Sequence, residues 1–443
     1  MKQLILTYFL FILAMPVFSQ FSISGGRGVA YEIGSANEVL KSVYLFNSLS
    51  GASISYTPSS VSATVKFYKY NATGNRTEIT LPGGGFYQID NLEDANGYIA
   101  VEAGEEVAAV WIIDYNMHPC KLTSVTVEEN EKERCEEVIS LRVVDESDIL
   151  QYYTTTGGQR SIERLYSYKY KNKQWNNKTD TFDQIEQGEE NYSFYESILI
   201  VGKENLPLEN TTFTVSGDQF SDALGISRQS VSVDYTAVAV DAHILWDIEG
   251  EGEDESEANT REDGEDGDYS APLIVNFYGH TNEPTANHFT WYVYDNSSSD
   301  PDNWIFMSRD RDMTYTFSRA GTFRVVFEVS NTNAPCMVSV EVEKPFVISE
   351  SLLKVPNYFS PGDSPGVNDE FKVKYKSLIR FRCTIFNRWG NKLFQFDDPE
   401  KGWDGKYKGK YVNPGVYFYV IDAEGSEGKK YKMGGDINIL RSK

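Results

Sequence analysis

Alternation of apolar and polar residues with a period of two dominates the chain after its first twenty residues. Phe381, Cys383 and Ile385 alternate with polar neighbours, and a second alternation runs from Val416 to Val420. A period of two indicates β-strands that bury one face. No long stretch after residue 20 has the spacing of an amphipathic helix, so the pattern predicts an all-β protein.

Short strands separated by glycine- and proline-containing turns are typical of tandem immunoglobulin-like β-sandwich modules. A length of 443 residues fits about three or four units, at roughly 100 to 200 residues per domain. The pattern predicts a signal peptide at 1–19, β-sandwich modules at 20–128 and 129–248, an acidic linker at 249–270, a third module at 271–349 and a small terminal β-sandwich at 350–443.

A tyrosine stripe marks the second module. Tyr166, Tyr168 and Tyr170 fall on one face of a predicted strand. On an exposed face they would offer a platform for sugar rings, whereas in a sandwich they would pack between the sheets. We expect the packing role.

The acidic segment 249–268 contains eleven carboxylates, one arginine and no large apolar side chain. Such a composition cannot bury enough surface to offset the entropy of ordering. The segment is therefore predicted to be a self-repelling linker or loop.

The N-terminus has the features of a secretory leader. Lys2 precedes an apolar segment at 4–14, and Val17 and Ser19 supply small residues before Gln20. We therefore expect cleavage after Ser19 and export through the periplasm. No other segment reaches the roughly 20 apolar residues of a membrane helix, so we expect no transmembrane span.

Charge and histidine spacing limit the function classes. The net charge of −24 disfavours nucleic acid as a partner. The four histidines, at positions 118, 243, 280 and 288, are scattered, and neither an HExxH nor a CxxC motif is present. No catalytic residues are predicted, although the abundant carboxylates leave open an acid–base pair in residues 20–248.

Four cysteines remain in a chain expected to meet oxidising conditions. Cys120 and Cys135 flank a short predicted strand and are a candidate disulfide. Cys336 and Cys383 lie in different modules, so their state stays open between a bond and two buried thiols.

Several separated motifs occur in the last ninety residues: PNYFSP, FNRWG, WDG, a Gly-x-Tyr-x-Tyr strand and a closing Gly-Gly segment. Together they resemble the gliding-motility-associated C-terminal domain, the type B sorting signal of the type IX secretion system. Trp389 and Trp403 are expected in the core. The residues that match the motifs are Pro356, Asn357, Phe359, Ser360, Pro361, Asp363, Asn368, Asp369, Phe386, Asn387, Arg388, Trp389, Gly390, Trp403, Asp404, Gly405, Gly415, Tyr417, Tyr419, Gly435 and Arg441.

One segment departs from the family. The family usually reads SPNGDG before an Asn-Asp pair, and here the segment from Ser360 to Asp369 lacks that Asn and the second Asp-Gly step. Asp363, Asn368 and Asp369 offer oxygen atoms that suit calcium. Turn capping explains the same residues, so we expect no cofactor and keep calcium as the weaker candidate.

In the third module, 271–349, a strand with tryptophan is followed by a phenylalanine before a Gly-Thr turn and then by an alternating strand within 314–331. This pattern resembles a PKD-type immunoglobulin-like module. The resemblance implies that Trp291 packs in the core against Phe323, Val325 and Phe327.

Two functions remain open. In the first, the resemblance implies export by the type IX machinery and a non-catalytic role in adhesion, binding or gliding at the cell surface, with a surface glycan or protein as ligand. In the second, residues 20–248 form a secreted glycan- or peptide-active hydrolase. The lack of catalytic motifs favours the first.

Overall fold

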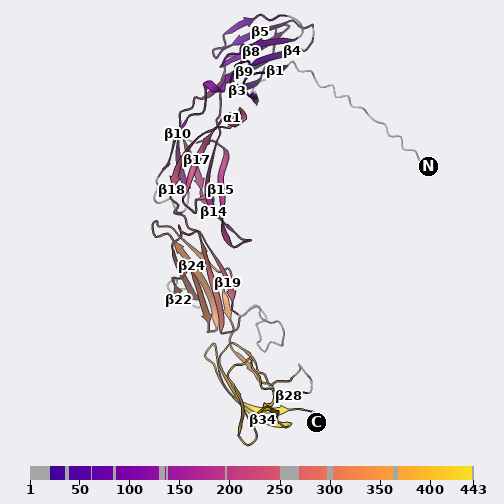
Figure 1. Cartoon of the computed structure of the whole chain (residues 1–443), viewed down its shortest axis with the longest axis vertical. Helices are drawn as coiled ribbons and strands as arrows, with labels where there is room; N and C mark the ends of the chain where they lie inside the picture. Colours follow the sequence, from indigo (N-terminus) through magenta and orange to yellow (C-terminus); the bar gives the residue numbers. More distant parts are fainter. Residues whose placement is uncertain are drawn as a thin grey trace, which may run out of the picture. The chain divides into compact units, whose positions relative to one another are not determined.

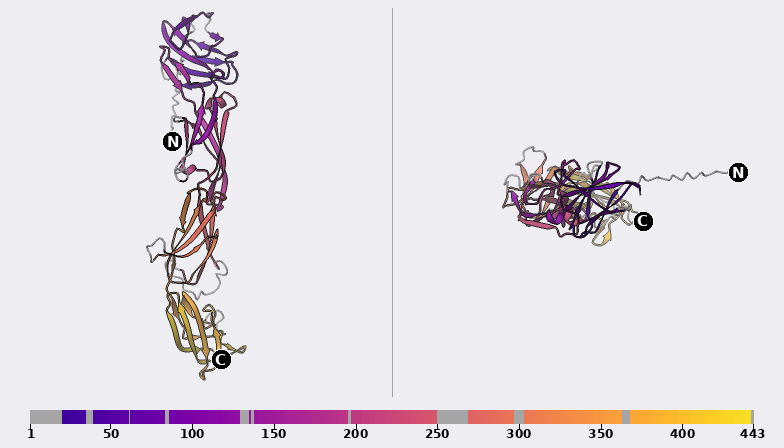
Figure 2. Two further views of the ribbon diagram at one scale, coloured as in Figure 1. Left: turned by 90° about the vertical axis from the view of Figure 1, so that its left-hand side faces the viewer. Right: turned by 90° about the horizontal axis from the view of Figure 1, so that it is seen from above.

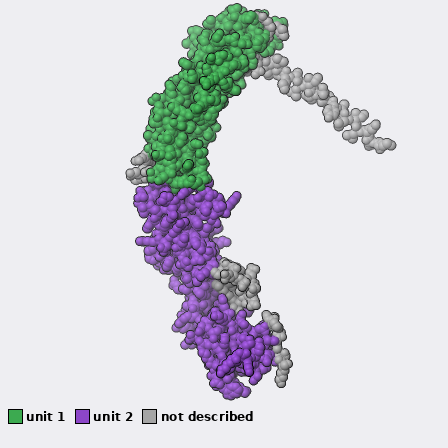
Figure 3. Space-filling view, viewed as in Figure 1, with its two compact units in different colours: residues 1–172, 184–236 green, residues 173–183, 237–443 purple. Residues whose placement is uncertain are grey.

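The structure, a computed structural model, describes residues 20–34, 39–60, 62–82, 86–128, 135, 138–194, 197–249, 269–296, 303–362 and 368–441. Strands dominate, which confirms the all-β prediction, and the described residues hold one short α-helix. The chain divides into two compact units, residues 1–172 with 184–236 and residues 173–183 with 237–443 (Figure 3). The predicted signal peptide lies outside the described residues. Among the described helices, none is long and apolar enough to cross a membrane.

The first sandwich opens the first unit (Figure 1). Its elements are β1 (Gln20–Ser24), β2 (Tyr31–Gly34), β3 (Leu40–Phe46), β4 (Ser53–Thr57), β5 (Val65–Tyr70), β6 (Arg76–Ile79), β7 (Tyr87–Asp90), β8 (Asn96–Glu102), β9 (Glu105–Asp114) and the 3-10 turn η1 (Tyr115–Met117). The sheet β1-β4-β7 faces the sheet β2-β3-β9-β8-β5-β6. Tyr56, Phe67 and Ile54 fill the core between them, as expected for strands that bury alternate residues.

The second sandwich completes this unit, except for its residues 173–183, which belong to the second unit. Its elements are β10 (Leu122–Glu128), β11 (Val138–Asp145), β12 (Leu150–Tyr153), β13 (Gln159–Ile162), β14 (Tyr166–Asn176), β15 (Thr181–Tyr192), β16 (Ile198–Gly202), η2 (Lys203–Asn205), β17 (Thr211–Gly217), α1 (Gln219–Ala223) and β18 (Gln229–Tyr235). Its larger sheet has the order β15-β14-β17-β18. Tyr166, Tyr168 and Tyr170 are all buried, so the predicted packing role of this stripe is confirmed.

The two sandwiches of the first unit share a hydrophobic cluster. Trp111 and Tyr70 from the first sandwich contact a cluster that includes Leu150, Tyr152 and Phe220 from the second. The hydroxyl of Tyr70 also donates to the backbone oxygen of Tyr153 at 3.0 Å. This shared core makes the pair a single packed body.

A buried ion pair lies beside this cluster. Arg164 and Asp218 pair with side chains that are 6% and 0% exposed. Asp218 also accepts from the Tyr115 hydroxyl at 2.8 Å and caps α1 through the amides of Phe220 and Ser221. The network fixes η1, the segment around Arg164 and α1 to one another.

Besides residues 173–183, the second unit contains the third module and the C-terminal domain. Its strands are β19 (Ala242–Ile248), β20 (Leu273–Thr281), β21 (His288–Asp295), β22 (Trp304–Ser308), β23 (Asp312–Phe317), β24 (Gly321–Ser330), β25 (Met337–Glu341) and β26 (Phe346–Ile348). Trp291 is fully buried and stacks on Phe327, with ring centroids 4.2 Å apart. Phe323 and Val325 belong to the same core, so the predicted packing of Trp291 is confirmed.

The boundary predicted at residue 248 is wrong. β19 pairs with β20 in antiparallel register from Ala242–Thr281 to Ile248–Val275, so β19 belongs to the third module. The acidic residues 250–268 lie outside the described residues, but they connect two adjacent strands of one sheet and not two modules. Strand pairing across a long insertion costs little more than across a short one, because loop-closure entropy grows slowly with length.

The C-terminal domain completes the chain (yellow in Figures 1 and 2). Its strands are β27 (Leu352–Lys354), β28 (Tyr358–Phe359), β29 (Lys374–Lys376), β30 (Leu378–Phe386), β31 (Lys392–Phe396), β32 (Lys406–Tyr407), β33 (Lys410–Tyr411), β34 (Gly415–Gly425) and β35 (Lys430–Ile439). The main sheet has the order β28-β35-β34-β30-β31. Its core contains Phe371, Cys383 and Trp403 and shares no residue with the core of the third module.

The predicted disulfide between Cys120 and Cys135 is wrong. Cys120 is a free, buried thiol, and its sulfur lies over Gly217. Cys383 is also free and buried, whereas Cys135 and Cys336 are the disulfide-bonded cysteines. Proximity in sequence failed as a guide because Cys120 points into the core of its own sandwich.

We expect neither free thiol to react with iodoacetamide in the folded protein at neutral pH. Burial raises the pKa of Cys120 to about 11 and that of Cys383 to about 12, and the thiolate is the reactive form. In urea without reductant both should react, whereas Cys135 and Cys336 should react only after reduction. Peptide mass spectrometry distinguishes the four, and alkylation of Cys135 before reduction would contradict this assignment.

Candidate functional site

Aromatic motif residues of the C-terminal domain anchor its core. Phe359 and Trp403 are buried with ring centroids 5.6 Å apart, and Tyr417 meets Trp403 edge-on at 5.8 Å. The indole nitrogen of Trp403 donates to the Lys406 backbone oxygen at 2.9 Å. The position predicted for Trp403 is therefore confirmed, and these residues hold the domain together.

Two further motifs serve the same core. Gly435 lies directly opposite Tyr419 in the sheet, and a Cβ on Gly435 would collide with the Tyr419 ring. Asp404 accepts from the Lys406 amide at 3.0 Å and from its ammonium at 2.8 Å. Burial alone would raise the pKa of Asp404, but the bonds from Lys406 outweigh it and the pKa is lowered.

The turn between β30 and β31 has a different role. Asn387 accepts through its side chain from the amides of Trp389 at 3.0 Å and Asn391 at 2.9 Å. Gly390 has φ of +81°, which glycine adopts without strain. The turn leaves Trp389 70% exposed, so its predicted place in the core is wrong. The Arg388 guanidinium lies 4.2 Å from the Trp389 ring centroid.

The calcium candidates give no site within the described residues. Asp363 lies outside them. Asp369 accepts from the Gly362 amide at 3.1 Å, and the Asn368 backbone oxygen accepts from the Ser360 amide at 2.8 Å. No described group of three or more His, Cys, Asp or Glu side chains is arranged for a metal ion. Calcium binding stays a prediction.

The other motif residues lie at the ends of strands. Pro356 and Asn357 precede β28, and the Asn357 backbone oxygen accepts from the Asn438 amide at 2.9 Å. Pro361 is buried against Gly405. Gly415 begins β34, and Arg441 lies 5.1 Å from the Tyr411 ring centroid. The motifs are brought into one domain, but their role in sorting stays a prediction.

The outer face of the main sheet carries an apolar stripe. Tyr417 and Tyr419 turn inward on β34, and Val416, Phe418 and Val420 turn outward with 49%, 42% and 53% of their surface exposed. Phe386, which precedes the Trp389 turn, is the cross-strand partner of Phe418. Exposed apolar residues gathered on one face of a domain are typical of an interaction surface.

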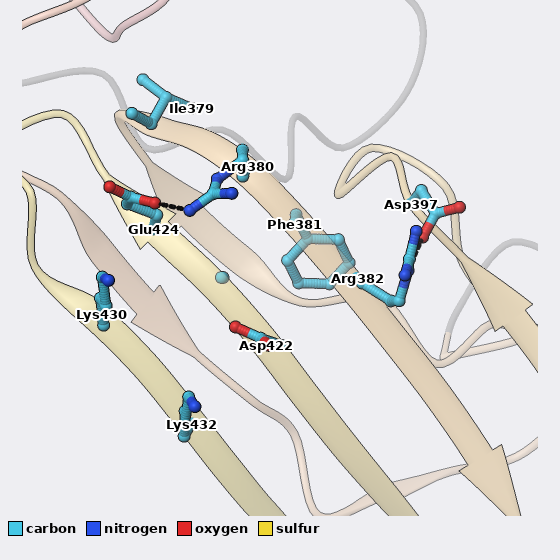
Figure 4. A pocket seen from close by; sticks show the side chains of 10 residues that line it. Ile379, Arg380, Phe381, Arg382, Asp397, Asp422, Glu424, Lys430 and Lys432 are labelled. Carbon is cyan, nitrogen blue, oxygen red and sulfur yellow. Dashed lines mark hydrogen bonds and ion pairs between the residues drawn. The ribbon is translucent and has the colours of Figure 1, made fainter.

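The other half of this face is charged (Figure 4). A shallow hollow of about 550 Å³ is lined by four cations and three carboxylates. Arg380 pairs with Glu424, and Arg382 bonds Asp397 at 2.6 Å. This bond from Arg382 lowers the pKa of Asp397. The charged lining residues are Arg380, Arg382, Lys430, Lys432, Asp397, Asp422 and Glu424.

The charge of the C-terminal domain is opposite to that of the rest of the chain. Residues 350–443 contain 17 Lys and Arg against 12 Asp and Glu, a net charge of +5, and residues 1–349 contain 24 against 53, a net charge of −29. A basic domain with an exposed apolar stripe complements an apolar surface with an acidic rim. The sequence analysis missed this surface because a period of two predicts a strand but not which of its two faces packs against the core.

Comparison with known families agrees with these features. Residues 353–438 match the CHU_C type IX secretion signal domain, and residues 126–233 match a fibronectin type III domain. The chain is thus a multi-module β protein with a C-terminal type IX signal. It is exported to the cell surface or the extracellular space and handled by the type IX machinery. A search of curated proteins found no match.

Solved structures with tandem β-sandwiches resemble the chain at low identity. A tetra-tandem repeat from the extending region of a large adhesion protein is 12% identical, with TM-score 0.23 and coverage of 90% of this chain and 99% of that one. A Ca²⁺-stabilised adhesin that helps an Antarctic bacterium reach out and bind ice is 11% identical, with TM-score 0.21 and coverage of 93% and 100%. Similarity this low supports no conclusion about function.

Proposed function

We propose that this protein is a non-catalytic surface or secreted factor whose upstream sandwiches bind a ligand and whose C-terminal domain is read by the exporter through the outer face of its main sheet. The apolar stripe of Val416, Phe418 and Val420 carries the proposal. Trp389 is exposed on the turn that follows Phe386, the cross-strand partner of Phe418. Tryptophan and arginine are enriched among residues that dominate binding energy at interfaces, and Arg388 and Trp389 stand together at this turn.

The histidines support the non-catalytic part, because three of them make structural contacts. His118 bonds Asp94 at 2.9 Å, and His243 stacks on Trp175 with ring centroids 4.2 Å apart. His280 is the cross-strand partner of His243. A screen of the purified chain against glycan and peptide substrates tests this part, and turnover abolished by a single carboxylate substitution would overturn it.

Trp389→Ala is expected to reduce surface display about tenfold or more, because truncating an anchor tryptophan at an interface costs about 2 kcal/mol or more. The fold should be unaffected, since the side chain is outside the core. Fractionation and surface immunolabelling measure the displayed protein.

The matched control is Tyr407→Ala, which removes another exposed aromatic side chain of the same domain, on β32. It should be displayed normally. Phe418→Asp, within the apolar stripe, should repeat the defect of Trp389→Ala. If Trp389→Ala and Phe418→Asp are both displayed at the normal level, the exporter does not read this face.

A further inference from the structure

Three aromatic side chains gather on the outer face of one sheet of the third module. On β21, Tyr292 and Tyr294 alternate with the buried Trp291 and Val293. Trp304 is the cross-strand partner of Tyr294 on β22 and is 44% exposed. The Tyr292 ring centroid lies 6.0 Å from that of Tyr294 and 6.3 Å from that of Trp304. The three rings form an aromatic platform across two strands.

A fixed polar edge borders the platform. Arg324, the partner of Tyr294 on β24, lies 4.9 Å from the Tyr294 ring centroid. Its guanidinium bonds Glu341 at 3.0 Å and the Asn296 side chain at 3.0 Å. The edge therefore presents both hydrogen-bond donors and acceptors at set positions beside an apolar surface.

These rings lie outside the core cluster of the module. The core of this module is already filled by Trp291, Phe277 and Phe327. On the outer side of the opposite sheet, β19-β20-β23, the hydroxyl of the exposed Tyr278 donates to Asp247 at 2.9 Å. Asn276 on the same face bonds Asp247 at 3.0 Å and accepts from Thr314 at 2.8 Å. The exposed tyrosine of that face is thus held by a polar network, whereas the other face carries three neighbouring aromatic rings.

We propose that Tyr292, Tyr294 and Trp304 bind a neutral polysaccharide chain, with its sugar rings stacked on the aromatic platform and its hydroxyl groups bonded along the Arg324–Glu341 edge. An aromatic face packs against the apolar face of a sugar ring and leaves the hydroxyls free. The rings are tilted by 35° and 50°, which suits a single twisted chain better than a flat crystalline surface. The net charge of −24 disfavours acidic polysaccharides.

This inference rests on the proposed function, because it supplies the ligand class for an exported protein that binds without cleaving. Its test is affinity electrophoresis of the purified full chain through gels that contain hydroxyethylcellulose, glucomannan or laminarin, with alginate as the acidic comparison. At least one of the three neutral polysaccharides should retard the chain. Trp304→Ala and Tyr294→Ala should each raise the dissociation constant measured from the retardation about tenfold. Tyr294→Phe should leave this constant unchanged, because the ring remains.

Tyr407→Ala is the matched control, since it removes an exposed aromatic side chain from another domain, and it should migrate like the unaltered chain. Thermal melting checks that each variant is folded. Retardation by none of the neutral polysaccharides, or retardation that Trp304→Ala and Tyr294→Ala both leave unchanged, would overturn the platform. Binding is measured on purified protein, so failure here is distinct from an export defect and from detection of cleavage products.

Discussion

Removing residues 350–443 is expected to leave the protein in the periplasm with its leader cleaved. The match to a type IX secretion signal domain covers 353–438, so the deletion removes the whole signal. Surface display should fall to background, and the periplasmic fraction should contain the truncated chain. Cell fractionation with surface protease treatment measures both pools.

The structure shows why this deletion tests export and not folding. β26 ends at Ile348 and completes the sheet of the third module by pairing with β24. The next strand, β27, begins at Leu352 and belongs to the C-terminal domain. The deletion removes the hydrogen bonds that Ser377 makes with Ser270 and Ala271. The core of the third module, which includes Phe346, remains whole.

The matched control is the reverse transfer, in which residues 350–443 are fused to an unrelated periplasmic protein. The fusion should reach the surface, because residues 350–443 contain the whole sorting signal. Normal display of the truncated chain would refute the assignment of the signal. Thermal melting of the purified truncated chain checks that it is folded, which distinguishes a failure of export from misfolding and degradation in the periplasm.

The two tryptophans of the C-terminal domain show what sequence can and cannot predict. Both stand in motifs and both were expected in the core, but only Trp403 is buried. Trp389 is held outside by the side-chain cap of Asn387 and by Gly390 at positive φ. Local turn chemistry thus overrides hydrophobicity here, and an Asn-x-x-Gly pattern around a tryptophan is the signal that would have indicated it.

Period-two alternation predicted the strands well but not their partners. β19 and β20 pair across the acidic segment, although the sequence pattern placed them in different modules. On β34 the tyrosines face the core because Tyr419 covers Gly435 on the neighbouring strand. The pairing of strands and the face that each strand buries depend on residues far apart in sequence, so the pattern of one strand alone does not predict them.

The buried ion pair of Arg164 and Asp218 also depends on residues far apart in sequence, and no motif predicts it. We expect Asp218→Ala to destabilise the first unit by about 3–5 kcal/mol, because it leaves the Arg164 guanidinium buried without its partner charge. The change also removes the cap of α1 and the acceptor of the Tyr115 hydroxyl. Hydrogen exchange of peptides around Tyr115 and Arg164 measures the loss of stability within the multi-domain chain.

Asp222→Ala is the matched control, because Asp222 lies on the same helix with a side chain 61% exposed and pairs with Arg228 at the surface. An exposed pair contributes about 0–1 kcal/mol, so this variant should exchange almost like the unaltered protein. Adding Arg164→Met to Asp218→Ala should restore part of the lost stability, since no unpaired charge then remains buried. Equal exchange in Asp218→Ala and Asp222→Ala would mean that the pair does not hold the two sandwiches of the first unit together.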